Sequence, residues 1–133
     1  MRLRTIALAL LLGSAGCRRD VGPAERYAAF AAAAREGDGE AVWSMLSERS
    51  REAFEARARA LAARVPPGTV TTSGRQLVLG DLAPRARRPR SVVVVRESRD
   101  AAVVNVEVEG EPAREASLVR EGGAWRVVVP FGN

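Results

Sequence analysis

The sequence contains no histidine and no lysine, and Cys17 is its only cysteine among 133 residues. Histidine is the most frequent general base near neutral pH and a leading metal ligand in proteins. A zinc site without histidine and without a second cysteine would need carboxylates alone, which is rare. The single cysteine also excludes an intrachain disulfide, so the apolar core must hold the fold together. We therefore expect no metal site, no cofactor and no disulfide.

The first seventeen residues have the order of a bacterial export signal. Residues 1–4 form a short basic head, residues 5–12 are an almost wholly apolar run, and residues 13–16 are small. This order is typical of a secretory signal peptide. With Cys17 directly after the small residues, the segment resembles the lipobox of bacterial lipoproteins. The resemblance implies a diacylglyceryl group on the Cys17 thiol and cleavage by signal peptidase II between Gly16 and Cys17.

Three other interpretations fit the leader less well. A transmembrane helix needs about 20 apolar residues to cross the hydrocarbon layer, and residues 5–16 are too few. Plain secretion would leave a lone thiol at the new N-terminus, and a cytosolic helix of this composition would lack a polar face. We therefore expect a lipid-anchored protein of the cell envelope that faces the periplasm. By analogy with the lipoproteins, Arg18 after the cysteine favours the outer membrane, in a cell that has one.

These features divide the chain into a signal peptide (1–16), a lipidated cysteine with its tether (17–23) and one domain (24–133). The first half of the domain predicts three helices. One begins at Pro23, which suits a first helical turn, and ends before Gly37. Asp38 and Ser47 have side chains that can cap a second and a third helix. The third helix carries an apolar stripe, which we expect to pack against a strand face: Phe54, Ala58, Leu61 and Val65.

The second half of the domain predicts an antiparallel sheet. Alternation is clearest in residues 101–109, where Ala102, Val104, Val106 and Val108 share one face. Gly122 and Gly123 signal a tight hairpin between the last two strands. The predicted strands are residues 76–82, 91–97, 101–109, 114–121 and 124–129. The sequence therefore predicts an α+β domain in which N-terminal helices pack on a curved antiparallel sheet of four to five strands.

This order of elements resembles the nuclear transport factor 2-like (cystatin-like) superfamily. The residues that carry the resemblance are 27–30 (YAAF), 38–42 (DGEAV), 46–48 (LSE) and 122–127 (GGAWRV). In particular, it resembles small bacterial lipoproteins whose exported domain has this fold and no assigned function. The resemblance implies that the first helix packs into the hollow of a curved, cone-shaped sheet.

The superfamily includes isomerase-like and cyclase-like enzymes, so catalysis has to be considered. Such sites use a buried Asp or His base opposite a Tyr or Asp donor. Here Asp20, Asp38 and Asp100 fall in the tether or in expected turns, Asp81 lies near the end of a predicted segment beside a loop, and Glu107 and Glu109 alternate onto the polar strand face. We therefore predict that the domain is not an enzyme and has no catalytic residues.

Two groups of side chains are candidates for binding. Tyr27, Phe30, Trp43 and Trp125 could line a pocket in the cone or simply fill its core. Arg85, Arg87, Arg88 and Arg90 form the densest charge cluster and could contact an anionic envelope surface, or form an ordinary solvated loop.

The functional expectation is a membrane-tethered, non-catalytic domain that binds a protein or a small ligand, or that only supports the envelope. The partner we predict is the membrane, through the lipid on Cys17. A sequence pI near 11.0 would ordinarily suggest nucleic acid, but export argues against that partner. The alternatives are an exported isomerase-like or cyclase-like enzyme, and an envelope-binding module that uses residues 84–90.

Overall fold

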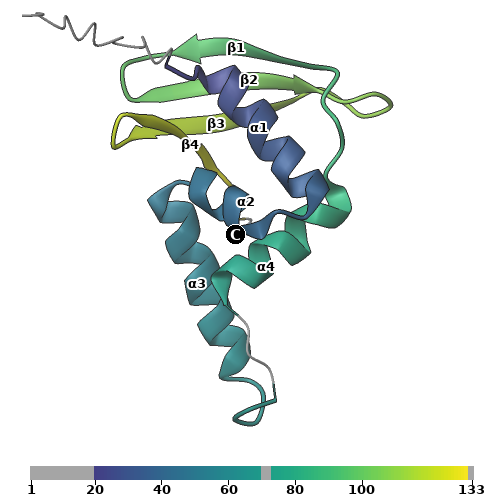
Figure 1. Cartoon of the computed structure of the whole chain (residues 1–133), viewed down its shortest axis with the longest axis vertical. Coiled ribbons are helices and arrows are strands. Elements are labelled where there is room, and N and C mark those ends of the chain that lie inside the picture. The colour runs from purple at the N-terminus through teal and green to yellow at the C-terminus, as the bar shows by residue number, and fades with distance from the viewer. Residues whose placement is uncertain (1–19, 70–72, 132–133) are drawn as a thin grey trace, which may run out of the picture.

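Helices precede strands along the chain, as Figure 1 shows for the computed structural model, which describes residues 20–69 and 73–131. The helices are α1 (Pro23–Glu36), α2 (Gly39–Met45), α3 (Glu48–Ala62) and α4 (Gly74–Leu82), followed by the short 3₁₀ helix η1 (Ala83–Arg85). The strands are β1 (Ser91–Glu97), β2 (Ala101–Glu107), β3 (Arg114–Glu121) and β4 (Ala124–Val128). The predicted α+β class is confirmed. The predicted cleavage and lipidation positions, Gly16 and Cys17, lie outside the described residues.

The predicted starts of the first three helices and the predicted end of the first are confirmed. Gly37 ends α1 in the left-handed conformation (φ 72°), which glycine adopts without steric cost. The Asp38 carboxylate accepts a hydrogen bond from the Ala41 amide (3.0 Å) at the start of α2. The Ser47 hydroxyl accepts one from the Ser50 amide (3.2 Å) at the start of α3. Each side chain satisfies an amide that the helix itself leaves unpaired.

The four strands form an antiparallel meander in the order β1-β2-β3-β4. On one face, here called the inner face, Val104 lies between Val94 of β1 and Ala116 of β3. Helix α1 crosses the inner face (Figure 1) and shares its core with the strands. The buried β2 residues on this face are those that the alternation predicts: Ala102, Val104 and Val106, with Val108 just after the strand.

The corner between α2 and α3 is attached to the free edge of β4. Leu46 forms a parallel bridge to Val127, and the Ser47 amide donates to the Val127 carbonyl (2.9 Å). The buried Ser50 hydroxyl accepts hydrogen bonds from the Val129 amide (3.0 Å) and from the Ser47 hydroxyl (2.9 Å). These bonds fix the position at which the chain leaves β4.

The strand predicted at residues 76–82 is wrong, because this segment is helix α4. Ser73 and Gln76 form a capping box in which the hydroxyl accepts from the Gln76 amide (3.2 Å) and the Gln76 side-chain carbonyl accepts from the Ser73 amide (3.0 Å). Such a box stabilises a helix start. Val78 is then fully buried among the helices, and the sheet keeps four strands.

The expected packing of the third helix is only partly correct. Phe54 is buried, and its ring meets that of Phe131 edge-on at a centroid distance of 4.8 Å. Leu61, however, is 40% exposed, and Val65 follows the end of the helix. Helix α3 packs chiefly against α4, and its C-terminal end projects away from the sheet (Figure 1). The stripe therefore does not cover the face of Val104, Val106 and Val108.

Candidate functional site

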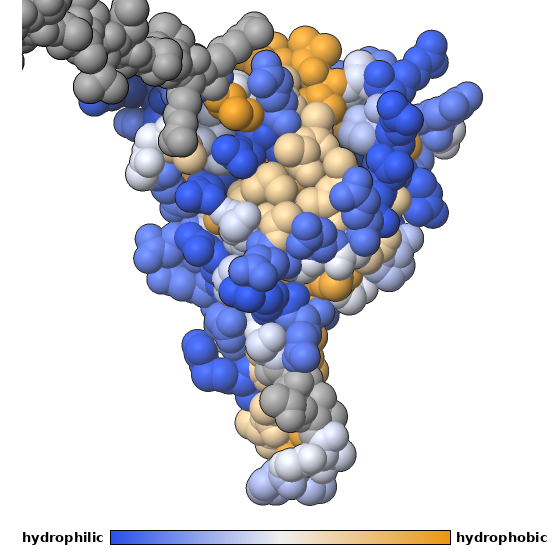
Figure 2. Space-filling view, viewed as in Figure 1, coloured by the Kyte–Doolittle hydropathy of each residue, from blue (hydrophilic) through white to orange (hydrophobic). Residues whose placement is uncertain are grey.

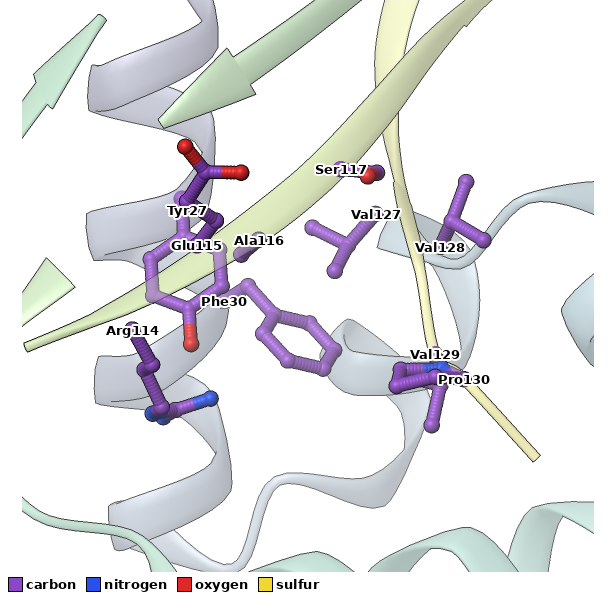
Figure 3. A pocket seen from close by; sticks show the side chains of 10 residues that line it. All are labelled: Tyr27, Phe30, Arg114, Glu115, Ala116, Ser117, Val127, Val128, Val129 and Pro130. Carbon is purple, nitrogen blue, oxygen red and sulfur yellow. The ribbon is translucent and has the colours of Figure 1, made fainter. Parts of the chain in front are cut away.

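A pocket of about 390 Å³ opens between α1, β3 and the chain that leaves β4 (Figure 3). Its volume lies near the lower limit for small-molecule sites in proteins. The lining residues are Tyr27, Phe30, Arg114, Glu115, Ala116, Ser117, Val127, Val128, Val129 and Pro130.

The pocket exists because β3 and β4 separate at one end. Their last pair is Ser117 with Val128, so residues 114–116 of β3 have a partner only on the β2 side. Beyond Val128 the chain turns toward α3, where the Ser50 hydroxyl holds the Val129 amide. The gap that results is closed on the inner face by α1.

Two aromatic residues of α1 form the wall of the pocket on the inner face. Tyr27 is 5% exposed and Phe30 is 6% exposed, and their ring centroids lie 6.0 Å apart. They are three residues apart in the helix, so both rings point to the same side, toward Ala116 and Val127 (Figure 3). The prediction that Tyr27 and Phe30 line a pocket is consistent with this arrangement.

The two charged residues of the pocket point to different faces of the sheet. Arg114 pairs with Val106 and so belongs to the inner face, whereas Glu115 pairs with Asn105 on the opposite face. The Glu115 carboxylate binds the Arg96 guanidinium there (3.0 Å). Within the described ranges, no carboxylate pairs with Arg114. The inner part of the pocket therefore carries one positive charge.

The two tryptophans do not join this pocket. Trp125 is buried in the core, and the Arg120 guanidinium lies 4.7 Å from its ring centroid. Trp43 is half-buried and borders a separate surface hollow with charged residues of α3. The structure thus separates the four aromatic candidates into a pocket pair and two residues with other surroundings.

The arginine cluster is exposed but does not form one site. Arg88 and Arg90 line a shallow groove along α1 together with Arg35. Figure 2 shows a weakly hydrophobic strip on this side of the molecule, with hydrophilic residues around it. Arg85 borders a different hollow near Phe131. Arg87 donates hydrogen bonds to the carbonyls of Pro84 and Ala86 (3.3 and 3.4 Å), which holds its side chain against its own loop.

Sequence reasoning missed three of the residues that define the pocket, namely Arg114, Ala116 and Val129. Arg114 lies at the start of a predicted strand and showed no distinguishing pattern. Its importance depends on the separation of β3 from β4, which no local signal indicates.

The described lining residues of the pocket include one acid. This acid, Glu115, lies on the face of β3 opposite to that of Arg114 and pairs with Arg96. No group of three or more Cys, Asp or Glu side chains in the described ranges could hold a metal ion. Across residues 20–69 and 73–131, each helix is too short or too polar to traverse a bilayer. The absence of catalysis stays a prediction.

Comparisons with known proteins find a similarity in structure. Neither the protein-family models nor the curated proteins match the chain. The structure is similar to that of a protein from Campylobacter jejuni provisionally named an NTF2-like transpeptidase, with a TM-score of 0.49 and 15% sequence identity. The match covers 82% of this chain and 99% of the other. Similarity at this level says nothing about activity or ligand.

Proposed function

We propose that the chain is a bacterial envelope lipoprotein whose domain (24–133) is nuclear transport factor 2-like and binds a small molecule without transforming it. The order of basic, apolar and small residues before Cys17 supports export and lipidation. The meander with α1 across its inner face supports the superfamily assignment. The lipid anchor would keep the domain at the membrane on its periplasmic side.

The observation that carries the binding function is the pocket beside Tyr27 and Phe30. An apolar cavity with a few converging polar groups is the usual form of a small-molecule site. Acid–base catalysis would in addition need a titratable partner opposite the Tyr27 hydroxyl. Glu115, the one acid among the described lining residues, lies on the other face and pairs with Arg96, so it is not placed for that role.

The anchor is tested by replacing the cysteine. Cys17→Ser removes the thiol that accepts the diacylglyceryl group, so we expect an uncut precursor on immunoblots of membrane fractions. Globomycin, which inhibits the processing peptidase, should make the wild-type precursor accumulate in the same way. Normal maturation and release of Cys17→Ser protein would contradict lipidation.

The pocket is tested by filling it. Ala116 faces α1 from β3 and lines the pocket, so Ala116→Leu should occupy much of its space. Ala29→Leu on α1 is the matched control, because Ala29 is exposed and lies outside the pocket. We expect native mass spectrometry of full-length protein to detect small-molecule binding in the wild type and in Ala29→Leu, but not in Ala116→Leu. Equal binding by both variants would exclude this pocket as the site.

A further inference from the structure

Tyr27 is a buried residue that lines the pocket, and its hydroxyl makes no hydrogen bond within the described part of the chain. Tyr27 is 95% buried, and a buried tyrosine usually directs its hydroxyl to a hydrogen-bond partner. Tyr27 lines the pocket, and Figure 3 shows its hydroxyl on the side of the pocket where Arg114 lies. It can donate a hydrogen bond to an acceptor there.

The backbone of β3 offers a second donor. The Arg120 amide donates to the Asp100 carbonyl on the β2 side (2.8 Å), so even-numbered residues of β3 direct their amides toward β2. Odd-numbered residues then direct theirs toward β4. The ladder with β4 ends at Ser117 and Val128, so the Glu115 amide faces the gap between the strands. That gap is the pocket.

Arg114 supplies the charge. Its side chain lies on the inner face at the pocket, and Figure 3 shows it on the same side as the Tyr27 hydroxyl. A guanidinium binds a carboxylate through two parallel hydrogen bonds, and these charge-assisted bonds are stronger than neutral ones. The pocket therefore combines one cation with two neutral donors, and the acceptor that suits all three is an anionic oxygen group.

Apart from Ser117, which pairs with Val103 on the opposite face, the remaining lining side chains are apolar. Phe30, Ala116, Val127, Val129 and Pro130 surround the rest of the space, which can bury a compact hydrocarbon group. We propose that the pocket binds a small monocarboxylic acid with an apolar body, such as an aryl or branched alkyl carboxylic acid. The carboxylate lies at Arg114, Tyr27 and the Glu115 amide, and the apolar body lies against Phe30 and Val127.

This ligand class rests on the proposed function and follows from the balance of charge. One guanidinium neutralises one negative charge, whereas a dianionic phosphate would bring excess charge into a mostly apolar space. A cationic ligand would be repelled by Arg114. A sugar would leave most of its hydroxyls facing Phe30, Val127 and Val129 without partners.

The test compares an acid with its amide. Full-length protein in lipid nanodiscs is titrated by calorimetry with 3-phenylpropanoic acid and 3-phenylpropanamide at pH 7, with empty nanodiscs as the blank. We expect the acid to bind about tenfold or more tightly than the amide, because only the acid is charged. Arg114→Gln should remove this preference, and Tyr27→Phe should weaken acid binding about fivefold.

Arg99→Gln is the matched control, because Arg99 is exposed in the turn between β1 and β2 and lies outside the pocket. This variant should keep the full preference for the acid. Equal affinity for acid and amide in the wild type, a preference that survives Arg114→Gln, or no acid binding up to 10 mM (roughly the weakest affinity that the titration resolves) would overturn the ligand class. If a neutral ligand still binds and Ala116→Leu abolishes its binding, the proposed function stands and only the ligand class is wrong.

Discussion

Phe54 and Leu61 occupy the same apolar stripe of α3, but the structure predicts very different consequences for their removal. Phe54 is 1% exposed and packs edge-on against Phe131, whereas Leu61 is 40% exposed on the projecting end of the helix. Truncating a buried phenylalanine to alanine costs roughly 3–5 kcal/mol, because it loses apolar burial and leaves a cavity. A surface substitution usually changes stability by less than about 0.5 kcal/mol.

We therefore expect Phe54→Ala to lose a large part of the total stability, which for a domain of this size is about 5–15 kcal/mol. With a urea m-value of about 2 kcal/mol per molar, the midpoint should fall by roughly 2 M. Leu61→Ala should leave the midpoint almost unchanged. Urea unfolding followed by circular dichroism measures both.

Equal destabilisation by Leu61→Ala and Phe54→Ala would contradict this expectation, since the stripe would then be buried along its whole length. A double-mutant cycle with Phe131→Ala tests the ring contact itself. We expect a coupling energy of about 0.5–1.5 kcal/mol between Phe54 and Phe131.

Two further substitutions, each with a matched control, test contacts made by the helices. A Cβ on Gly74 would lie 2.8 Å from the Glu55 backbone nitrogen, so Gly74→Ala should cost about 1–3 kcal/mol by forcing α4 away from α3. A Cβ on Gly80 in the same helix would have no atom within 4 Å, so Gly80→Ala should stabilise the domain by about 0.5–1 kcal/mol. Urea unfolding measures both variants. Equal effects of Gly74→Ala and Gly80→Ala would contradict the close approach of α4 to α3. Ser50→Ala leaves the Val129 amide without its acceptor and should cost about 1–3 kcal/mol, whereas the exposed Ser44→Ala should cost less than about 1 kcal/mol.

The elements that the sequence predicted correctly are those with local signals. Gly37, Asp38 and Ser47 act within one helical turn, and the alternation of residues 102–108 reports directly which side of a strand is buried. The strand prediction for residues 76–82 was wrong because a short apolar run with a β-branched residue suits a strand and a buried helix equally well. The Ser73 and Gln76 capping box was the signal that could have distinguished them.

The pocket could be predicted only in part. Helical spacing placed Tyr27 and Phe30 together on a buried face, and they do lie together. Trp43 and Trp125 have the same apolar character, but whether they reach a cavity depends on the paths of neighbouring segments. Arg114 gains its position from the end of the β3–β4 ladder, which Ser50 of a distant helix helps to set. Such a relation between remote segments leaves no pattern in the sequence.

The strand order has a consequence for how the chain folds. Each strand pairs with the one next to it in sequence, so the three hairpins can form early at little cost in chain entropy. Helix α1 is different, since it packs against β4, which comes about 90 residues later in the chain. Helix α1 can find its final packing only after β4 has been made and paired. Until then its apolar face stays open, so an N-terminal fragment that lacks β4 should remain a substrate for chaperones and proteases.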